Sequence, residues 1–322
     1  MQRPRFLPDD FTLALLAVVT LASVWPAQGA VAQAFEWITT AAIALLFFMH
    51  GAKLSRSAVL AGLGHWRLHL LVVALTFVLF PVLGLLLKPV LVWSLSPELA
   101  LGMLFLCTLP ATVQSAIAFT AMGRGNVAAA VCSASASSLI GVFVTPFLVS
   151  WLVVPGGVSG AGAWDAVIRI MEQLLLPFVL GQLAQPWIGG WVKRHAVAVR
   201  RVDQSSILLV VYTAFSAAVM EGLWSRVPWP MLLALGLVCT VLLVLVLLIS
   251  TWASRRLGFS KEDEVTIVFC GSKKSLASGV PMAKVLFAAP VVGMMLLPVM
   301  VFHQIQLMVC AVMAQRYGRR PE

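Results

Sequence analysis

The chain has 322 residues, of which 61% are hydrophobic and 11% charged, and its mean hydropathy is +0.99. These values exclude a soluble globular domain and indicate an integral membrane protein. The formal net charge of +10 raises the question of a nucleic-acid partner. Nucleic-acid surfaces gather basic residues on one face with aromatic side chains between them, whereas here the basic residues are scattered over short loops, so we expect no such partner.

A helix that crosses the membrane needs about 20 apolar residues. The segments that meet this requirement are about 11–25, 34–52, 67–87, 98–121, 127–153, 166–188, 204–223, 230–253, 264–287 and 289–314. The first segment follows Arg3 and Arg5 and resembles a signal peptide, but Pro26-Ala-Gln-Gly29 is a poor cleavage site, so we expect a retained helix. The predicted fold class is an all-α integral membrane protein with ten transmembrane helices.

The basic residues predict an orientation. With the N-terminus inside, 16 of the 22 Lys and Arg residues fall at cytoplasmic positions. The outside positions hold only Lys88, Arg169, Arg226 and Lys284, and Lys273 and Lys274 fall within a span. This positive-inside bias predicts a multi-pass protein of the inner (plasma) membrane with both termini in the cytoplasm, surrounded by lipid.

The chain divides into two halves of five spans. A linker of small residues, Val154-Pro-Gly-Gly-Val-Ser-Gly-Ala-Gly-Ala163, separates residues 1–155 from residues 156–322. Because each half has an odd number of spans, the second half would lie inverted in the membrane. In each half the fourth span is interrupted at its centre, at 109–116 and at 269–275. Paired interruptions of this kind indicate a transporter's binding site near the membrane midplane.

Polar residues next to the first interruption strengthen this prediction. The fifth span carries a stripe of hydroxyls, Ser133, Ser135, Ser137 and Ser138, one tight turn after the interrupted fourth span. Small residues in membrane helices commonly serve packing, and that alternative has about even weight for any single serine. Hydroxyls together with freed carbonyl groups would form an oxygen-lined site for a small cation or a polar solute.

These motifs resemble a known family. Pro110 with the polar stretch after it, Arg124-Gly-Asn-Val-Ala128, Thr145-Pro146 and Gly271-Ser-Lys-Lys-Ser-Leu276 are similar to the bile acid:sodium symporter family, in its YfeH-like branch. The resemblance covers nearly the whole chain. It implies a panel domain from spans 1, 2, 6 and 7, a core domain from spans 3, 4, 5, 8, 9 and 10, and a crossing of the discontinuous spans 4 and 9.

The resemblance also implies which residues would bind sodium ions. The corresponding positions are Thr76, Gln114, Ser115, Ala116, Ser133 and Ser135, with Ser272 in the second interruption. The chain departs from the family pattern in span 9, where Phe269 replaces a sodium-binding glutamate and Lys273 and Lys274 replace two amides. No cofactor other than sodium ions is implied, and the pattern carries no signal for an oligomeric state.

Two adjacent ammonium groups near the bilayer centre require a reason, because each costs about 2.5 to 3.5 kcal/mol on insertion scales. A shorter span would leave both lysines in water. Otherwise Lys273 or Lys274 could stand in place of a sodium ion, or the pair could hold an anionic solute and couple transport to protons. His303 and Gln304 in the last span are further candidates for substrate binding or coupling.

The leading interpretation is a secondary active transporter of an organic anion or similar amphipathic small molecule, working by alternating access and coupled to sodium. A proton-coupled or uncoupled transporter or exchanger that uses Lys273 and Lys274 is the alternative. An intramembrane enzyme with Ser272 as nucleophile and Lys273 as base is a distant third, because the chain has no Walker, HExxH or nucleophile-elbow motif. We therefore expect no enzyme activity.

Overall fold

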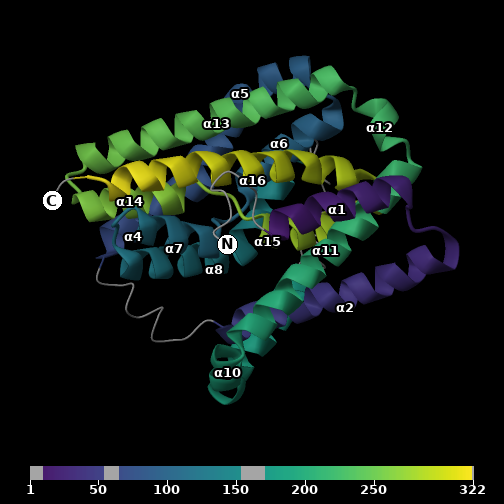
Figure 1. Cartoon of the computed structure of the whole chain (residues 1–322), viewed down its shortest axis with the longest axis horizontal. Coiled ribbons are helices and arrows are strands. Elements are labelled where there is room, and N and C mark those ends of the chain that lie inside the picture. The colour runs from purple at the N-terminus through teal and green to yellow at the C-terminus, as the bar shows by residue number, and fades with distance from the viewer. Residues whose placement is uncertain (1–9, 54–64, 154–170, 321–322) are drawn as a thin grey trace, which may run out of the picture.

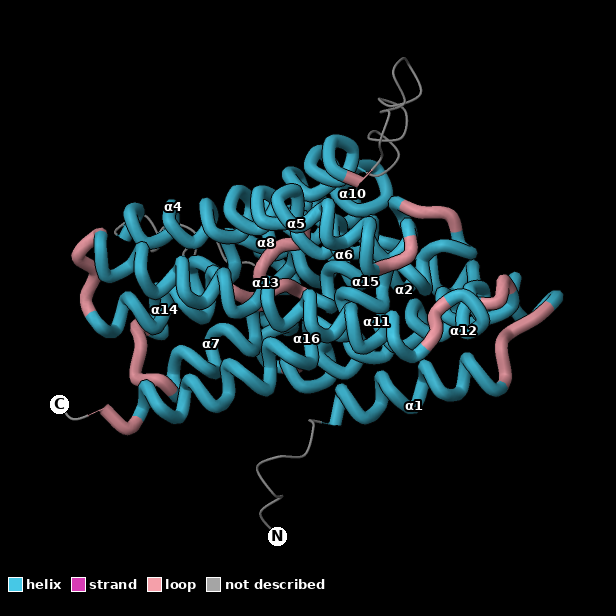
Figure 2. The backbone as a smooth tube through the Cα atoms, turned by 90° about the horizontal axis from the view of Figure 1, so that it is seen from above, coloured by secondary structure: helices cyan, strands magenta, loops and turns pink. Residues whose placement is uncertain are grey.

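The computed structural model describes residues 10–53, 65–153 and 171–320, and every regular element within these ranges is helical (Figures 1 and 2). The elements are α1 (Asp10–Val24), α2 (Gly29–Lys53), α4 (Trp66–Ala74), the π-helical turn η2 (Leu75–Leu79), α5 (Phe80–Ser94), α6 (Pro97–Thr108), α7 (Val113–Met122), α8 (Val127–Leu152), the π-helical turn η3 (Met171–Leu175), α10 (Leu176–Arg194), α11 (Ala196–Met220), α12 (Leu223–Arg226), α13 (Trp229–Arg256), α14 (Lys261–Gly271), α15 (Leu276–Leu286) and α16 (Ala289–Gly318).

Several of these helices are long and apolar enough to cross a membrane. Among the described residues the long apolar helices are α2, the continuous run α4–η2–α5, α8, α11, α13 and α16, and the bent pair α6–α7 counts as a seventh span. The remaining expected spans coincide with α1, with η3 and α10, and with α14 and α15. The all-helical membrane class is confirmed at this level, and the ten-span count and the inversion of the halves stay predictions.

The two expected interruptions are present. The fourth span is two helices, α6 and α7, bent by 63° at residues 109–112. The ninth is likewise divided into α14 and α15 at residues 272–275. In each half a long helix, α8 or α16, follows the divided pair. The linker 154–163 expected between the halves lies outside the described residues, as do Arg3, Arg5 and Arg169.

Serine side chains fix where three of the short helices begin. Ser96, Ser260 and Ser275 precede α6, α14 and α15, and each accepts a hydrogen bond from the main-chain N–H three residues later, at 3.3, 3.1 and 3.1 Å. An N-cap of this kind satisfies one of the N–H groups that the first turn leaves free. Both halves of the second divided span and the first half of the first are therefore capped by a serine, whereas Thr112 before α7 forms no such side-chain bond.

The helices form a main body and a smaller pair beside it (Figure 1). In the body α13 packs on both α14 and α16, and α16 also packs on α6 and α11. The pair consists of α2 and α10, which pack closely together and join the body chiefly through α11. Figure 2 shows loop segments among the helices in the middle of the body as well as at its ends.

Two glycines allow α2 and α10 to lie in contact. A Cβ atom on Gly51 of α2 would overlap the carbonyl oxygen of Phe178, and one on Gly181 of α10 would overlap that of Phe48. The two main chains therefore touch, as small residues permit between membrane helices. An ion pair between Lys53 of α2 and Asp203 of α11 adds a polar link at the end of α2.

We expect Gly181→Ala to lower the thermal stability of the purified protein, because its methyl group must push α2 and α10 apart. Gly190→Ala on the same helix is the matched control, since a Cβ there meets nothing within 4 Å. Ala is the better helix former by about 1 kcal/mol, so the control should be neutral or slightly stabilising. Equal melting temperatures for the two variants would contradict the contact.

Candidate functional site

The two interruptions contact each other directly. The Ser275 N–H donates to the Pro110 carbonyl oxygen at 2.9 Å, and the Thr112 hydroxyl donates to the Lys274 carbonyl oxygen at 2.8 Å. Residues 109–111 and 272–275 are buried. Main-chain groups that leave a helix in the membrane core must find protein partners. Here each interruption supplies partners to the other, and we call this contact the crossing.

Lys274 lies at the centre of the crossing. Its Nζ donates to the carbonyl oxygens of Thr76 at 2.8 Å, Cys107 at 3.0 Å and Leu109 at 2.7 Å. The lysine is 1% exposed, and Nζ is 4.1 Å from the centroid of the Phe80 ring. A charged ammonium has three N–H donors, and all three are used. A neutral amine would turn a lone pair toward an oxygen, so this geometry favours the charged form.

Gln306 of α16 holds the main chain of Lys274. Its Oε1 accepts from the Lys274 N–H at 2.9 Å, and its Nε2 donates to the Lys274 carbonyl oxygen at 2.9 Å. Nε2 also lies 2.9 Å from Nδ1 of His303, one helical turn earlier. A single amide therefore replaces both main-chain hydrogen bonds that a continuous helix would have given Lys274.

Lys273 has different surroundings, although it too is buried. Its Nζ donates to the Ser115 carbonyl oxygen at 2.8 Å and lies 3.8 Å from the ring centroid of Phe119 and 5.3 Å from that of Phe269. Ring faces attract a cation through their quadrupole. Both ammonium groups thus lie over aromatic rings, but Lys273 binds one carbonyl oxygen and Lys274 binds three.

Helix α8 supports the first interruption. The Ser137 hydroxyl accepts from the Ala111 N–H at 2.9 Å, and the Thr145 hydroxyl donates to the Thr108 carbonyl oxygen at 2.9 Å. Ser133, one turn before Ser137, lies 2.7 Å from Nδ1 of His69. Residues four apart share a helix face, whereas Ser135 lies between them on another face and is half-buried.

The other predicted residues differ in whether they contact a lysine and in how exposed they are. The Thr76 carbonyl and the Ser115 carbonyl each bind one lysine, and Ser272 is buried at the end of α14. Gln114 is exposed, and Gln304 is half-buried.

Ion pairs fix the far ends of the second divided span. Glu264 of α14 accepts two hydrogen bonds from Arg255 of α13, at 3.0 and 3.1 Å, and one each from Lys261 at 2.9 Å and Tyr317 at 3.2 Å. At the other end, Lys284 of α15 pairs with Glu36 of α2 at 2.8 Å. One half of the span is thus tied to the main body, and the other half to the α2–α10 pair.

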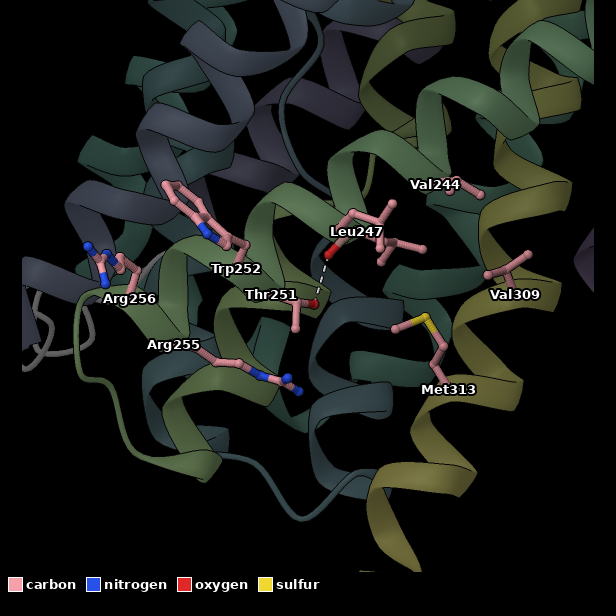
Figure 3. Close-up of a pocket in the computed structure, with 9 residues that line it drawn as sticks. Val244, Leu247, Thr251, Trp252, Arg255, Arg256, Val309 and Met313 are labelled. Atoms are coloured by element: carbon pink, nitrogen blue, oxygen red, sulfur yellow. Dashed lines mark hydrogen bonds between the residues drawn. The ribbon is translucent and has the colours of Figure 1, made fainter.

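A separate groove of about 700 Å³ runs between α13 and α16 (Figure 3). Its walls include Leu248, Trp252, Val309 and Met313, with Arg255 toward one end. Leu248 is 63% exposed and Trp252 is 65% exposed. Because no residue of either interruption lines it and its walls face outward, we expect membrane lipid to fill it.

Some of the crossing was not predicted from the sequence. Gln306 was overlooked although it lies three residues after His303, a spacing that puts both on one face. The π-helical turn at Leu75–Leu79 frees the Thr76 carbonyl group, and the sign of it in the sequence is Pro81. Proline has no N–H, so a carbonyl group in the preceding turn must lose its helical partner.

Interrupted helices that meet inside a multi-span helical body, with charge at the meeting point, are typical of secondary transporters. This architecture defines a membrane transport protein.

The comparisons with known proteins agree with this class. The profile of the SBF-like CPA transporter family matches residues 9–319. A protein of Pseudomonas aeruginosa described as uncharacterized is 65% identical over 320 residues, which are 99% of this chain and 96% of that protein. The Escherichia coli K12 protein named "Putative symporter YfeH" is 61% identical over 318 residues, 98% of this chain and 94% of its own. The rat "Sodium/bile acid cotransporter 7" is 29% identical over 275 residues, 84% of this chain and 80% of its own.

The chain therefore belongs to the SBF-like CPA transporter family. Its family and relatives are transporters of the bile acid:sodium type and not enzymes, which confirms the resemblance seen in the sequence and the expectation of no enzyme activity.

We expect Ser137→Ala to destabilise the protein by about 1 to 3 kcal/mol, the usual cost of a buried N–H group left unpaired, because the Ala111 N–H loses its acceptor. Ser135→Ala in the same helix removes the same hydroxyl from a half-buried position and should have little effect. Thermal unfolding of both variants in sodium-free detergent solution is the measurement. A larger loss for Ser135→Ala would reverse the assignment of the two faces of α8.

Proposed function

We propose that the chain is a secondary active transporter that moves an organic anion or a similar amphipathic solute across the inner membrane by alternating access. Both termini lie in the cytoplasm in this proposal. The observation that carries it is the crossing, where two divided spans satisfy each other's main chain around the buried Lys274 ammonium group. The name of the rat relative supports a bile-acid-like solute, which is an amphipathic organic anion.

The packing of the helices supports two moving bodies. In the proposal, α1, α2, α10 and α11 form a panel domain that α2, α10 and α11 hold together by mutual contact. The remaining helices, with both divided spans, form the core domain. These domains are built from two inverted repeats, residues 1–155 and 156–322. Movement of the core against the panel would open the crossing to one side of the membrane and then to the other.

We further propose that transport is coupled to a cation, with sodium as the first choice. The Ser115 hydroxyl oxygen is buried and has no hydrogen-bond partner among the described residues, so it is available to a small cation. Thr76, Gln114, Ser133, Ser135 and Ser272 are the other proposed positions along the ion path. His303 contacts Gln306, and Gln306 is bonded to the main chain of Lys274. A role of His303 in coupling would therefore act on the crossing through Gln306.

The proposed function is tested by uptake into proteoliposomes that contain the purified protein, with labelled taurocholate as the probe for the bile-acid class. Sodium, potassium and pH gradients are imposed one at a time. We expect saturable accumulation that a sodium gradient drives. Accumulation driven only by a pH gradient would replace sodium with protons, and flux that never exceeds the equilibrium level would contradict active transport.

A second test concerns the ion pair between Glu36 and Lys284, which joins α2 of the proposed panel to α15 of the proposed core. If α2 and α15 separate during alternating access, Glu36→Gln removes the ion pair that favours the described conformation. The conformation in which the two helices are apart then becomes more populated. We expect longer distances between spin labels on α2 and α15, measured by pulsed EPR in a cysteine-free background.

The matched control for this test is Glu98→Gln, which neutralises a carboxylate at the start of α6 that forms no ion pair among the described residues. Its distance distribution should equal that of the wild type. The exchanged pair Glu36→Lys with Lys284→Glu should return the distances toward the wild-type values. An unchanged distribution in Glu36→Gln would contradict a bridge between moving bodies.

A further inference from the structure

Three carbonyl oxygens around Lys274 form a cation-binding shell. They come from Thr76 in η2, from Cys107 in the last turn of α6 and from Leu109 in the first interruption, and each is at most 1% exposed. They are separated by up to 33 positions in the sequence, yet all three reach one atom. Such convergence on a single buried point is what oxygen ligands do around a metal cation.

Each of these carbonyl groups is available because a helical hydrogen bond is missing. The Phe80 N–H, which would bind the Thr76 oxygen in an α-helix, binds that of Leu75. The next residue, Pro81, has no N–H to offer. The Cys107 oxygen would pair with the Ala111 N–H, but that group donates to Ser137. Leu109 lies in the interruption itself. The shell thus depends on the π-helical turn before Pro81, on the Ser137 hydroxyl and on the interruption that contains Leu109.

The chemistry of the shell suits a small hard cation. Unwound main-chain carbonyls and the C-terminal ends of half-helices coordinate sodium or protons in transporters with broken helices. The negative end of the α6 dipole lies at Cys107 and adds to the attraction. Three buried carbonyl oxygens with no partner would each carry a desolvation cost, so the fold needs hydrogen-bond donors or a cation at this point.

We propose that Lys274 is a tethered cation that permanently occupies a monovalent-cation site, so that no free ion needs to enter this part of the crossing. This proposal fits the contacts better than an anion-binding role, because an anion would need an N–H of Lys274 and all three are directed at carbonyl oxygens. It deepens the proposed function, since it assigns one coupling position to the protein itself. Its test does not require transport.

The test is thermal unfolding of Lys274→Ala in detergent, in chloride salts of sodium, lithium, potassium and choline at one ionic strength. The variant keeps the oxygens and removes the ammonium group. In choline chloride it should melt well below the wild type. Sodium or lithium should raise its melting temperature saturably, because a ligand that binds only the folded state stabilises it. The wild type should show a smaller increase above choline, because sodium can bind there only at the proposed positions around Ser115.

Lys273→Ala is the matched control, since it removes a neighbouring buried ammonium group that contacts one carbonyl oxygen and two aromatic rings. It should be destabilised, and sodium should raise its melting temperature no more than it raises that of the wild type. An equal response of the two variants, or no response of Lys274→Ala to any of the metal cations, would overturn the proposal.

If Lys274→Ala does not fold, Lys274→Gln replaces it, because the amide keeps two N–H donors for the shell. Its melting temperature should respond to sodium more weakly, and a purified variant with no sodium response would equally refute the tethered cation. A protein that transports nothing in the uptake assay can still pass this test. If the protein is an active transporter but metal cations change the melting temperature of neither Lys274 variant, the tethered cation is refuted and the proposed function stands.

Discussion

A main-chain N–H or C=O group that leaves a helix inside the membrane has no water to bind, and each unsatisfied group costs several kcal/mol. This chain leaves the helical path at residues 109–112 and again at 272–275, within the interior of the helical body. Its solution is mutual. Ser275 donates to the carbonyl oxygen of Pro110, and Thr112 donates to that of Lys274. The ammonium group of Lys274 binds three further carbonyl oxygens.

This arrangement links the centre of the molecule to its two ends. Glu264 ties the start of α14 to α13, and Lys284 ties α15 to α2. Between these anchors the main chain of residues 272–275 is bonded to the first interruption and to Gln306. In the cycle we propose, a displacement of α15 from α2 would reach the crossing, because α15 begins directly after Ser275, whose N–H binds the Pro110 carbonyl oxygen.

The two adjacent lysines illustrate how a broken helix separates neighbours. In a regular helix the side chains of Lys273 and Lys274 would point about 100° apart around the helix axis. In the interruption, Lys273 reaches α7 and lies on the faces of Phe119 and Phe269, and Lys274 reaches three carbonyl oxygens from other elements. Both charges lie over aromatic rings, but the Lys273 ammonium group has one carbonyl oxygen as partner and that of Lys274 has three. The difference arises from the partners, since the two side chains are chemically the same.

Composition and hydropathy alone established the membrane class, because an apolar run of this length has no other stable environment. Pro110 and the polar residues around Lys273 likewise marked both interruptions, since residue type decides where a membrane helix can continue. The sequence could not show that the interruptions touch, that Gln306 closes around Lys274, or that Thr76 contributes its carbonyl group instead of its hydroxyl. Those contacts join residues up to 198 positions apart, and they depend on how helices cross, which only the packed tertiary structure decides.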